Sequence, residues 1–475
     1  MRLSSKILKG GAQVALGQLG QQILLLVRNV FVARLLPEEQ FGIALTFMTV
    51  LAALDALTEI GIEVYILRSR NIDEGSLQGT LHTMLILRGL IAGLGLFAVA
   101  DFVAYLFGVP ESASAYRWLA LVPVIRGFMH LDYKRFERQY RYTPSIIVTF
   151  LSVIVNAIVG IGLAWYTRSP FAVVLGSIAQ MLVHVAVSHI VAEKKYQILF
   201  DKQQARDMMT FGNPLIPNAI MLFAVNQGDK VLVGAKLGLR ALENYGVVAI
   251  LATGIALLIH RATAPIYLPL LSEHDEGSPE YQARFDACGA ATTIISIATV
   301  AFFAFVGESF IKLAFGAKYE PTALLVTLLG IRVSLKFMRN WPQKAFLANA
   351  KTSMLFYSNL IAALGLAMGF VSTLMGYGMV EVATCFVVAE FIAAFHAVYS
   401  LYKVPALFRT SLKYMMLMYT FSIGVLAMQW WNLQPKGYVY EVLGGAFFVG
   451  LGLAIVLSQS PSLGKFVKDT IKARR

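Results

Sequence analysis

The chain has 475 residues, of which 57% are hydrophobic and only 14% are charged, and its formal net charge is +13. Soluble domains carry about one quarter charged residues, so this composition excludes an ordinary soluble protein and indicates a polytopic membrane protein. Only two cysteines are present, both inside apolar segments, and the seven histidines do not cluster at metal-ligand spacing. We therefore expect neither a disulfide framework nor a bound metal or cofactor.

The first element is an apolar helix behind a short basic N-terminus. The sequence begins "MRLSSKILKGGAQ", and the apolar stretch behind it reaches about residue 35. Because a signal-peptide core is shorter than this, we interpret the stretch as a transmembrane helix that stays in the mature protein.

Fourteen apolar segments of about 20 residues or more are long enough to cross a membrane, so we predict an all-α integral membrane protein with 14 transmembrane helices. They lie near residues 12–35, 42–67, 79–106, 114–132, 145–166, 171–192, 211–236, 243–268, 287–313, 321–348, 353–375, 378–401, 412–431 and 438–459.

Lysine and arginine concentrate in alternate connections, as in "YKRFERQYRYT", "EKKYQILFDKQQAR" and "GKFVKDTIKARR". Because cytoplasmic loops carry the excess of these residues, we expect both termini in the cytoplasm and the protein in the plasma (inner) membrane. The surplus positive charge then contacts lipid headgroups, and no nucleic-acid partner is needed to explain it.

A short internal repeat and the longest inner loop (residues 193–210) suggest how the helices are grouped. "VARLLPEEQFGIA" at residues 32–44 resembles "GAKLGLRALENYGVVA" at residues 234–249, and six expected helices separate the copies. Such a parallel repeat predicts two halves with the same orientation. We expect an N-terminal six-helix bundle at 1–195, a second bundle with a preceding amphipathic linker at 196–405, and two further helices with a basic tail at 406–475.

The stretch "LLGIRVSLKFMRNW" carries three cations inside an apolar segment. At 100° per residue, Arg332, Lys336 and Arg339 lie within about 60° of one another on a helix. Each buried cation costs about 2.5–3.5 kcal/mol near the bilayer centre, so the row is expected to face water or partner groups inside the protein. A row of this kind predicts an anionic substrate, because arginine binds phosphate oxygens through two hydrogen bonds.

The second segment, "LAALDALTEIGIEVYILR", has the opposite charge. A continuous helix would place Asp55, Glu59 and Glu63 on one stripe, where like charges raise one another's pKa. Two interpretations remain open: one carboxyl exchanges a proton during transport, or the stripe neutralises Arg28 of the preceding helix.

Several segments resemble one family. "RNVFVARLLPEEQFGIALTFMTVLAALDALTEIGIEVYILR", "RFERQYRYTP" and "FGAKYEPTALLVTLLGIR" are similar to segments of the polysaccharide-biosynthesis flippases (Wzx-type) of the multidrug/oligosaccharidyl-lipid/polysaccharide exporter superfamily. Asp229 and Lys230 match the Asp-basic pair that opens the family's second half, and Glu59 stands where the family often has Asp before Gly. The resemblance implies a MATE-like fold of two six-helix bundles with pseudo-twofold symmetry around a central cavity, plus two C-terminal helices.

The resemblance also implies a function. We expect a flippase, not an enzyme, that moves a polyprenyl-pyrophosphate-linked oligosaccharide from the cytoplasmic to the outer leaflet by alternating access, for surface polysaccharide such as O-antigen or exopolysaccharide. Its partners would be that lipid-linked oligosaccharide, membrane lipids and other proteins of polysaccharide assembly, and the chain would act as a monomer. The alternatives are a cation-coupled multidrug exporter on the same fold and a membrane-embedded polymerase or ligase, although the short outer loops disfavour an enzyme.

Two groups of residues are candidates for the transport site. The expected ion-coupling residues are Asp55, Glu59 and Asp229. The expected substrate-binding cations are Arg28, Arg126, Lys230, Arg261, Arg332, Lys336 and Arg339.

Overall fold

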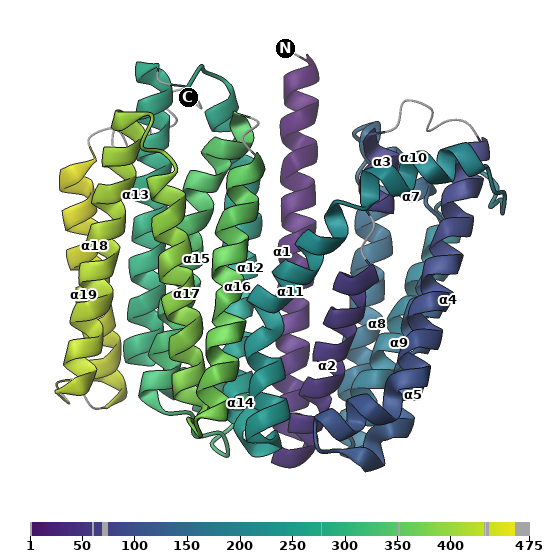
Figure 1. The fold of residues 1–475 in the computed structure, drawn as a ribbon, viewed down its shortest axis with the longest axis horizontal. Coiled ribbons are helices and arrows are strands. Elements are labelled where there is room, and N and C mark those ends of the chain that lie inside the picture. Colours follow the sequence, from purple (N-terminus) through teal and green to yellow (C-terminus); the bar gives the residue numbers. More distant parts are fainter. Residues whose placement is uncertain are drawn as a thin grey trace. The chain divides into compact units, whose positions relative to one another are not determined.

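The computed structural model describes residues 2–58, 61–68, 75–276, 278–349, 352–431, 433 and 437–460, and within them the chain forms helices and no β-strand (Figure 1). The helices are α1 (Arg2–Leu35), α2 (Glu38–Thr58), α3 (Ile62–Arg68), α4 (Gly75–Leu106), η1 (Pro110–Ser112), α5 (Ala113–Leu119), α6 (Leu121–Arg126), α7 (Asp132–Arg138), α8 (Thr143–Thr167), α9 (Phe171–Ile190), α10 (Lys202–Gly212), α11 (Leu215–Leu232), η2 (Val233–Leu237), α12 (Leu239–Ser272), α13 (Pro279–Ala301), η3 (Phe302–Val306), α14 (Gly307–Phe315), α15 (Ala323–Ala348), α16 (Thr352–Leu374), α17 (Met379–Tyr399), α18 (Pro405–Trp430) and α19 (Tyr438–Gln459).

The all-helical class predicted from composition is confirmed for the described residues. Ten helices are long and apolar enough to cross a membrane, and the bent pair at 202–212 and 215–237 makes eleven if it is one span. The expected spans at 12–35, 114–132 and 321–348 are outside that set. The last of them forms α15, which is long enough but carries four basic side chains, so its hydropathy is low. The count of fourteen spans therefore stays a prediction.

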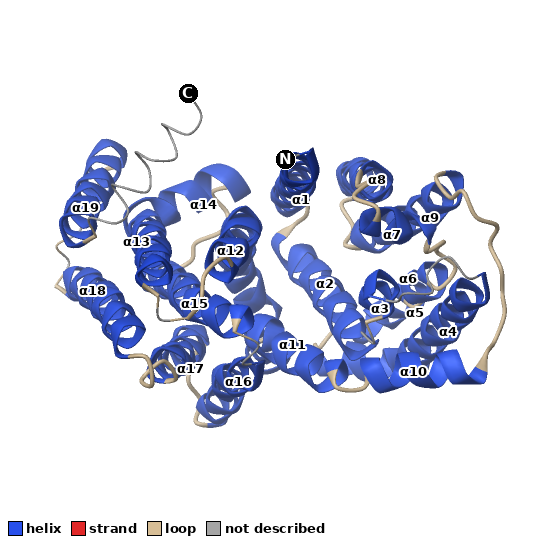
Figure 2. Cartoon of the chain, turned by 90° about the horizontal axis from the view of Figure 1, so that it is seen from above, coloured by secondary structure: helices blue, strands red, loops and turns tan. Residues whose placement is uncertain are grey.

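The helices form two compact units, residues 1–246 and 247–475, so that α12 begins in the first unit and continues in the second. In the first unit, α8 packs against α1 and α9, while α4 packs against α5 and α6, and α2 against α11 (Figure 2). The two copies of the sequence repeat also meet in this unit. A Cβ on Gly42 of α2 would lie 3.0 Å from the carbonyl oxygen of Leu239, and a Cβ on Gly246 would lie 2.2 Å from the Leu45 side chain. The aligned glycines thus let α2 and the start of α12 approach closely.

The second expected span is not one continuous helix. It divides into α2, which ends at Thr58, and α3, which begins at Ile62. Between them Gly61 has φ of +71°, a left-handed conformation that a residue with a side chain adopts only with strain. The prediction of an uninterrupted helix at 42–67, and of an acidic stripe at four-residue spacing along it, is therefore wrong.

In the second unit, α15 lies against α13 and α17, and α13 also contacts α18 and α19. Thr322 caps the N-terminus of α15 by accepting a hydrogen bond from the backbone N–H of Leu325. In the core around α13 and α15, the ring of Trp341 contacts the rings of both Phe285 and Tyr414. This packing holds α15, with its row of cations, in a fixed rotation about its own axis.

Candidate functional site

A charged cluster in the first unit surrounds Arg126, at the end of α6. Its Nη1 donates a hydrogen bond to Asp55 of α2 at 2.7 Å, and its Nη2 lies 3.4 Å from Glu63 of α3. Arg126 therefore joins the two helices on either side of the Gly61 break. Arg88 of α4 donates to the hydroxyl of Thr58 at 3.3 Å beside this cluster. Asp55, Arg88 and Arg126 line one small polar pocket.

The cluster continues from Arg126 to α7 through Glu63. Lys134 lies 3.5 Å from Glu63 and 3.0 Å from Glu137, which also accepts a hydrogen bond from Ser145. Burial alone would lower the pKa of Lys134, but the two carboxylates outweigh it and raise that pKa. Lys134 therefore stays charged and links α3 to α7.

Arg28 of α1 is buried, with 7% of its surface exposed. Its Nε donates to Asn156 of α8 at 2.8 Å, its Nη1 donates to Asn29, and Asn156 in turn donates to Gln180 of α9. Among the described residues, Asp55 and Glu63 contact Arg126 and not Arg28, contrary to the interpretation that the acidic stripe neutralises Arg28. Glu59 lies outside the described residues.

The Asp-basic pair sits at the C-terminal end of α11. Asp229 is buried and accepts a hydrogen bond of 2.7 Å from the hydroxyl of Tyr245, whose side chain is also fully buried. Lys230 is half-buried and donates to Gln227 one turn earlier at 2.6 Å. The side chains of Asp229 and Lys230, although adjacent in sequence, therefore lie in different surroundings.

The cationic row of α15 divides into two parts. Arg332 and Arg339 are seven residues apart, within about 20° on the helix, and both are buried against α17. The guanidinium carbon of Arg332 lies 4.5 Å from the centre of the Phe386 ring. The Nε of Arg339 donates to Glu390 at 2.6 Å, and its Nη1 donates to Asn359 of α16 at 2.6 Å. Glu390 neutralises Arg339, so this arginine joins three helices.

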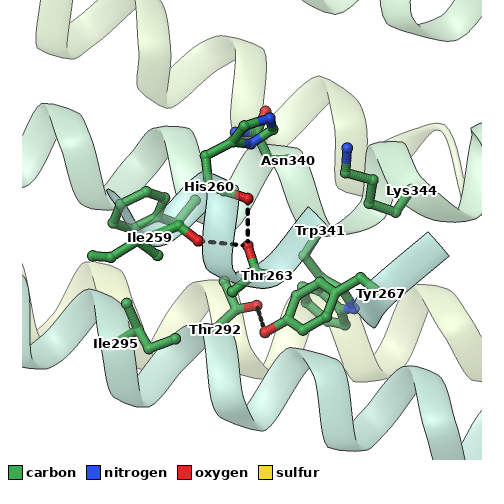
Figure 3. A pocket seen from close by; sticks show the side chains of 10 residues that line it. Ile259, His260, Thr263, Tyr267, Thr292, Ile295, Asn340, Trp341 and Lys344 are labelled. Carbon is green, nitrogen blue, oxygen red and sulfur yellow. Dashed lines mark hydrogen bonds between the residues drawn. The ribbon is translucent and has the colours of Figure 1, made fainter. Parts of the chain in front are cut away.

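The other part of the row is more accessible. Lys336, Asn340 and Lys344 follow at four-residue intervals and are each half-buried. Asn340 and Lys344 line a small pocket of about 20 Å³ together with His260 of α12 (Figure 3). Arg261, next to His260, is also half-buried. The described residues that line this pocket include His260 and Lys344 and no carboxylate.

The structure thus brings together some of the predicted residues and separates others. Asp55 and Arg126 meet in the first unit, and Arg332 with Arg339 face α17 in the second, whereas Arg28 and Asp229 each occupy a separate buried position. Sequence reasoning did not place Lys344 or Glu390 at a site. Lys344 continues the four-residue spacing of Lys336 and Asn340, a signal that was available, whereas nothing in the sequence around Glu390 identifies its partner.

The connection between α6 and α7, which is not part of any helix long and apolar enough to cross a membrane, is also held by polar contacts. Asp132, fully buried at the start of α7, accepts hydrogen bonds from Arg135 and from the backbone N–H groups of Glu193 and Lys194. Burial would raise the pKa of Asp132, but these donors outweigh it and hold the pKa at about 2. His130, in the connection between α6 and α7, accepts from the Asp132 N–H through Nδ1, and its Nε2 lies 3.0 Å from the Lys194 carbonyl. Burial lowers the pKa of His130.

Comparisons with known proteins place these features in a family. The family model described as "Polysaccharide biosynthesis protein" matches residues 31–324. The chain is 19% identical over 369 residues to the lipopolysaccharide biosynthesis protein WzxC of Escherichia coli (strain K12), covering 76% of this chain and 73% of that protein. It is 21% identical over 207 residues to the succinoglycan biosynthesis transport protein ExoT of Rhizobium meliloti (strain 1021), covering 44% of this chain and 42% of that protein.

Solved structures with the same fold include two kinds of transporter. The lipid II flippase MurJ in an inward closed conformation has a TM-score of 0.64 at 15% identity, covering 94% of this chain and 98% of that one. An inward-facing multidrug resistance MATE family transporter of the MOP superfamily has a TM-score of 0.60 at 14% identity, covering 84% and 99%. At these identities the likeness shows the fold alone.

Proposed function

This chain belongs to the polysaccharide biosynthesis protein family, and we propose that it is a flippase that moves a lipid-linked polysaccharide precursor across the inner membrane. Membership of the family over residues 31–324 is the observation that carries the proposal. The names of WzxC and ExoT point to the same process, because one is a lipopolysaccharide biosynthesis protein and the other a succinoglycan biosynthesis transport protein.

The substrate we propose is a polyprenyl-pyrophosphate-linked oligosaccharide, carried from the cytoplasmic to the outer leaflet by alternating access. Half-buried cations support an anionic substrate: Arg126 in the first unit, and Lys336, Lys344 and Arg261 in the second. The membrane potential favours this direction. Moving one negative charge out of a negative interior gains about 2.3 kcal/mol per 100 mV, and a diphosphate gains about twice as much.

The proposed residues fall into different roles. Lys336 and Arg261 are the most accessible of the proposed phosphate-binding cations in the second unit, together with Lys344. Arg332 and Arg339 are buried against α17, and we propose that they orient α15 while Lys336 reaches the substrate. Asp55, Glu59 and Asp229 stay as proposed ion-coupling residues.

The test is complementation of a strain that lacks its own flippase. Lys336→Gln combined with Lys344→Gln should abolish surface polymer while the abundance and size-exclusion profile of the protein stay normal. The matched control is Lys312→Gln combined with Glu308→Gln, which removes an exposed ion pair of α14. Normal surface polymer in the Lys336/Lys344 variant would reject the role of the cations, and no rescue by the unaltered chain would reject the function.

The second candidate function is that of a cation-coupled multidrug exporter, because the chain has the fold of a MATE family transporter. Organic cations need an accessible carboxylate in their pocket. Asp55 is accessible, because its side chain is 66% exposed although it forms an ion pair with Arg126. A drug-susceptibility panel on cells with and without the chain separates the two functions, because only an exporter changes the inhibitory concentrations of cationic drugs.

A further inference from the structure

An apolar groove of about 470 Å³ runs along the first unit between α2 and α4. It is lined by residues 49–58 of α2 and 91–106 of α4, and Phe223 and Val231 of α11 contribute to its wall. Nearly all of its lining is hydrocarbon. A groove of this kind accepts an apolar chain and excludes a soluble polar ligand.

One end of the groove is polar and positively charged. Thr58 and Ala92 line both the groove and the small pocket that contains Asp55, Arg88 and Arg126. The Asp55 side chain is 66% exposed, so its ion pair with Arg126 is solvated and contributes little binding energy of its own. A phosphate oxygen can therefore exchange with this carboxylate or share the guanidinium with it.

The groove is longer than one leaflet. Its lining on α4 extends from Ile91 to Leu106, which at 1.5 Å per residue is about 22 Å. The hydrocarbon core of a bilayer is about 30 Å thick, so one acyl chain of a phospholipid spans only about half of this thickness, which is less than the length of the groove. The length suits an isoprenoid chain that extends past the bilayer centre.

The charged end of the groove lies toward the N-terminal end of α4. Thr83 of α4 donates a hydrogen bond to the carbonyl of Leu199, in the polar connection that leads to α10. Arg88 is five residues further along α4, about 8 Å deeper than this connection. That depth matches the headgroup of a lipid in the leaflet on the same side, which in the proposed orientation is the cytoplasmic leaflet.

We propose that this groove binds the lipid part of the substrate, with a long isoprenoid chain between α2 and α4 and its diphosphate on Arg88 and Arg126. The assignment rests on the proposed function and deepens it, because it names where a polyprenyl diphosphate lipid enters. Arg88 and Arg126 form hydrogen bonds and ion pairs with the phosphate oxygens, and Thr58 holds Arg88 at the boundary between the polar and apolar parts.

Gly95 offers a variant that blocks the groove without disturbing the fold. It lines the groove, and a Cβ built on it meets no heavy atom within 4 Å. Gly95→Leu therefore extends a side chain into the groove. It should not disturb α4, because leucine has a higher helix propensity than glycine. Gly162 of α8 likewise has nothing within 4 Å and lies outside the groove, so Gly162→Leu is the matched control.

The experiment uses the full chain in proteoliposomes with a C55 polyprenyl diphosphate that carries a diazirine on its isoprenoid chain. After illumination, mass spectrometry should locate labels on residues 49–58 and 91–106. Gly95→Leu should reduce this labelling about tenfold, whereas Gly162→Leu should not change it. Arg88→Gln should reduce labelling by the diphosphate about tenfold, the equivalent of one charge-assisted hydrogen bond. It should leave labelling by the uncharged polyprenol probe unchanged, and Arg117→Gln, an exposed arginine outside the groove, should affect neither probe.

Two labelling results would overturn the proposal, in addition to the absence of labelling considered below. One is labelling that Gly95→Leu does not reduce. The other is equal labelling of the same residues by a diazirine phosphatidylglycerol that unlabelled polyprenyl diphosphate does not displace, which would assign the groove to a membrane phospholipid. Surface polymer in the complemented strain is measured in parallel. Rescue without groove labelling rejects the groove alone, whereas labelling without rescue rejects the proposed function.

Discussion

The ion pair between Arg339 of α15 and Glu390 of α17 gives the sharpest test of the second unit. Only 5% of the arginine side chain and 2% of the glutamate side chain are exposed, and the two are joined at 2.6 Å. Glu390→Gln keeps the size of the side chain and an acceptor oxygen but removes the charge. The remaining Arg339 would then be a buried cation whose main neighbour is neutral.

The expected cost follows from that burial. Breaking a buried ion pair by removing one partner costs about 3–5 kcal/mol, because an uncompensated charge is left in a medium of low polarity. Arg339→Met alone should cost a similar amount by leaving Glu390 buried. Replacing both residues, as Arg339→Met with Glu390→Leu, removes both charges and should cost much less than the sum of the single changes.

Unfolding in detergent micelles measures these differences. In a Cys385→Ser background, which removes the second, half-buried thiol, a thiol-reactive fluorophore reports the fraction of unfolded chains as heat exposes Cys288, which is 3% exposed in the folded protein. The Lys312→Gln variant, which opens an exposed pair, should change stability by less than about 1 kcal/mol and serves as the control. Single variants that cost less than about 1 kcal/mol, or costs that add up in the double variant, would refute the reasoning.

Three further predictions concern the first unit. Gly89→Ala should destabilise the chain by about 1–3 kcal/mol and lower transport, because its Cβ would lie 2.5 Å from a backbone carbonyl of α6, the helix that ends in Arg126. Gly95→Ala should be neutral, because its Cβ meets no atom within 4 Å. Transport and thermal unfolding of both variants test this. Asp132→Asn should weaken the contact of α7 with residues 193–194 by about 2 kcal/mol, since the pKa of about 2 makes the carboxylate stabilising above pH 4 and progressively less so as the pH falls toward 2; faster trypsin cleavage after Lys194 at neutral pH is the readout. Relative to an unstructured control peptide cleaved at the same pH, this cleavage should accelerate as the pH falls from about 7 to 5. The lowered pKa of His130 means that the released segment binds the proton more tightly than the packed one, and His130→Asn should flatten this dependence.

Sequence periodicity was sufficient to place the cations on α15 but not to assign their roles. The 100° rule put Arg332, Lys336 and Arg339 on one side of a helix, and α15 confirms that helix. The carboxylate that neutralises Arg339 is 51 residues away on another helix, and only tertiary packing brings it there. A hydrophobic pattern specifies which face of a helix is buried, whereas the identity of the neighbour depends on how helices are ordered in space.

The break between α2 and α3 shows a second reason why the sequence was insufficient. The segment that includes Asp55 and Glu63 has continuous apolar character, so hydropathy predicted one span. The structure interrupts this segment at Gly61, but a single glycine in a helical pattern does not by itself predict a break. As a result, Asp55 and Glu63 reach Arg126 from two separate helices, 71 and 63 residues away in sequence.

The division of charge along α15 carries a consequence for transport. Arg332 and Arg339 are held by Phe386 and Glu390 of α17, so their side of the helix is fixed to its neighbour. A helix fixed on one side presents its remaining surface at a constant rotation, and the half-buried Lys336 and Lys344 lie about 50° and 130° round the helix from the two arginines. Under the proposed function, losing the Glu390 contact should therefore misplace Lys336 as well as destabilise the fold. Glu390→Asp, which keeps the charge but shortens the side chain, should retain most of the stability and still lower transport. Full transport by Glu390→Asp would show that the rotation of α15 does not position the substrate.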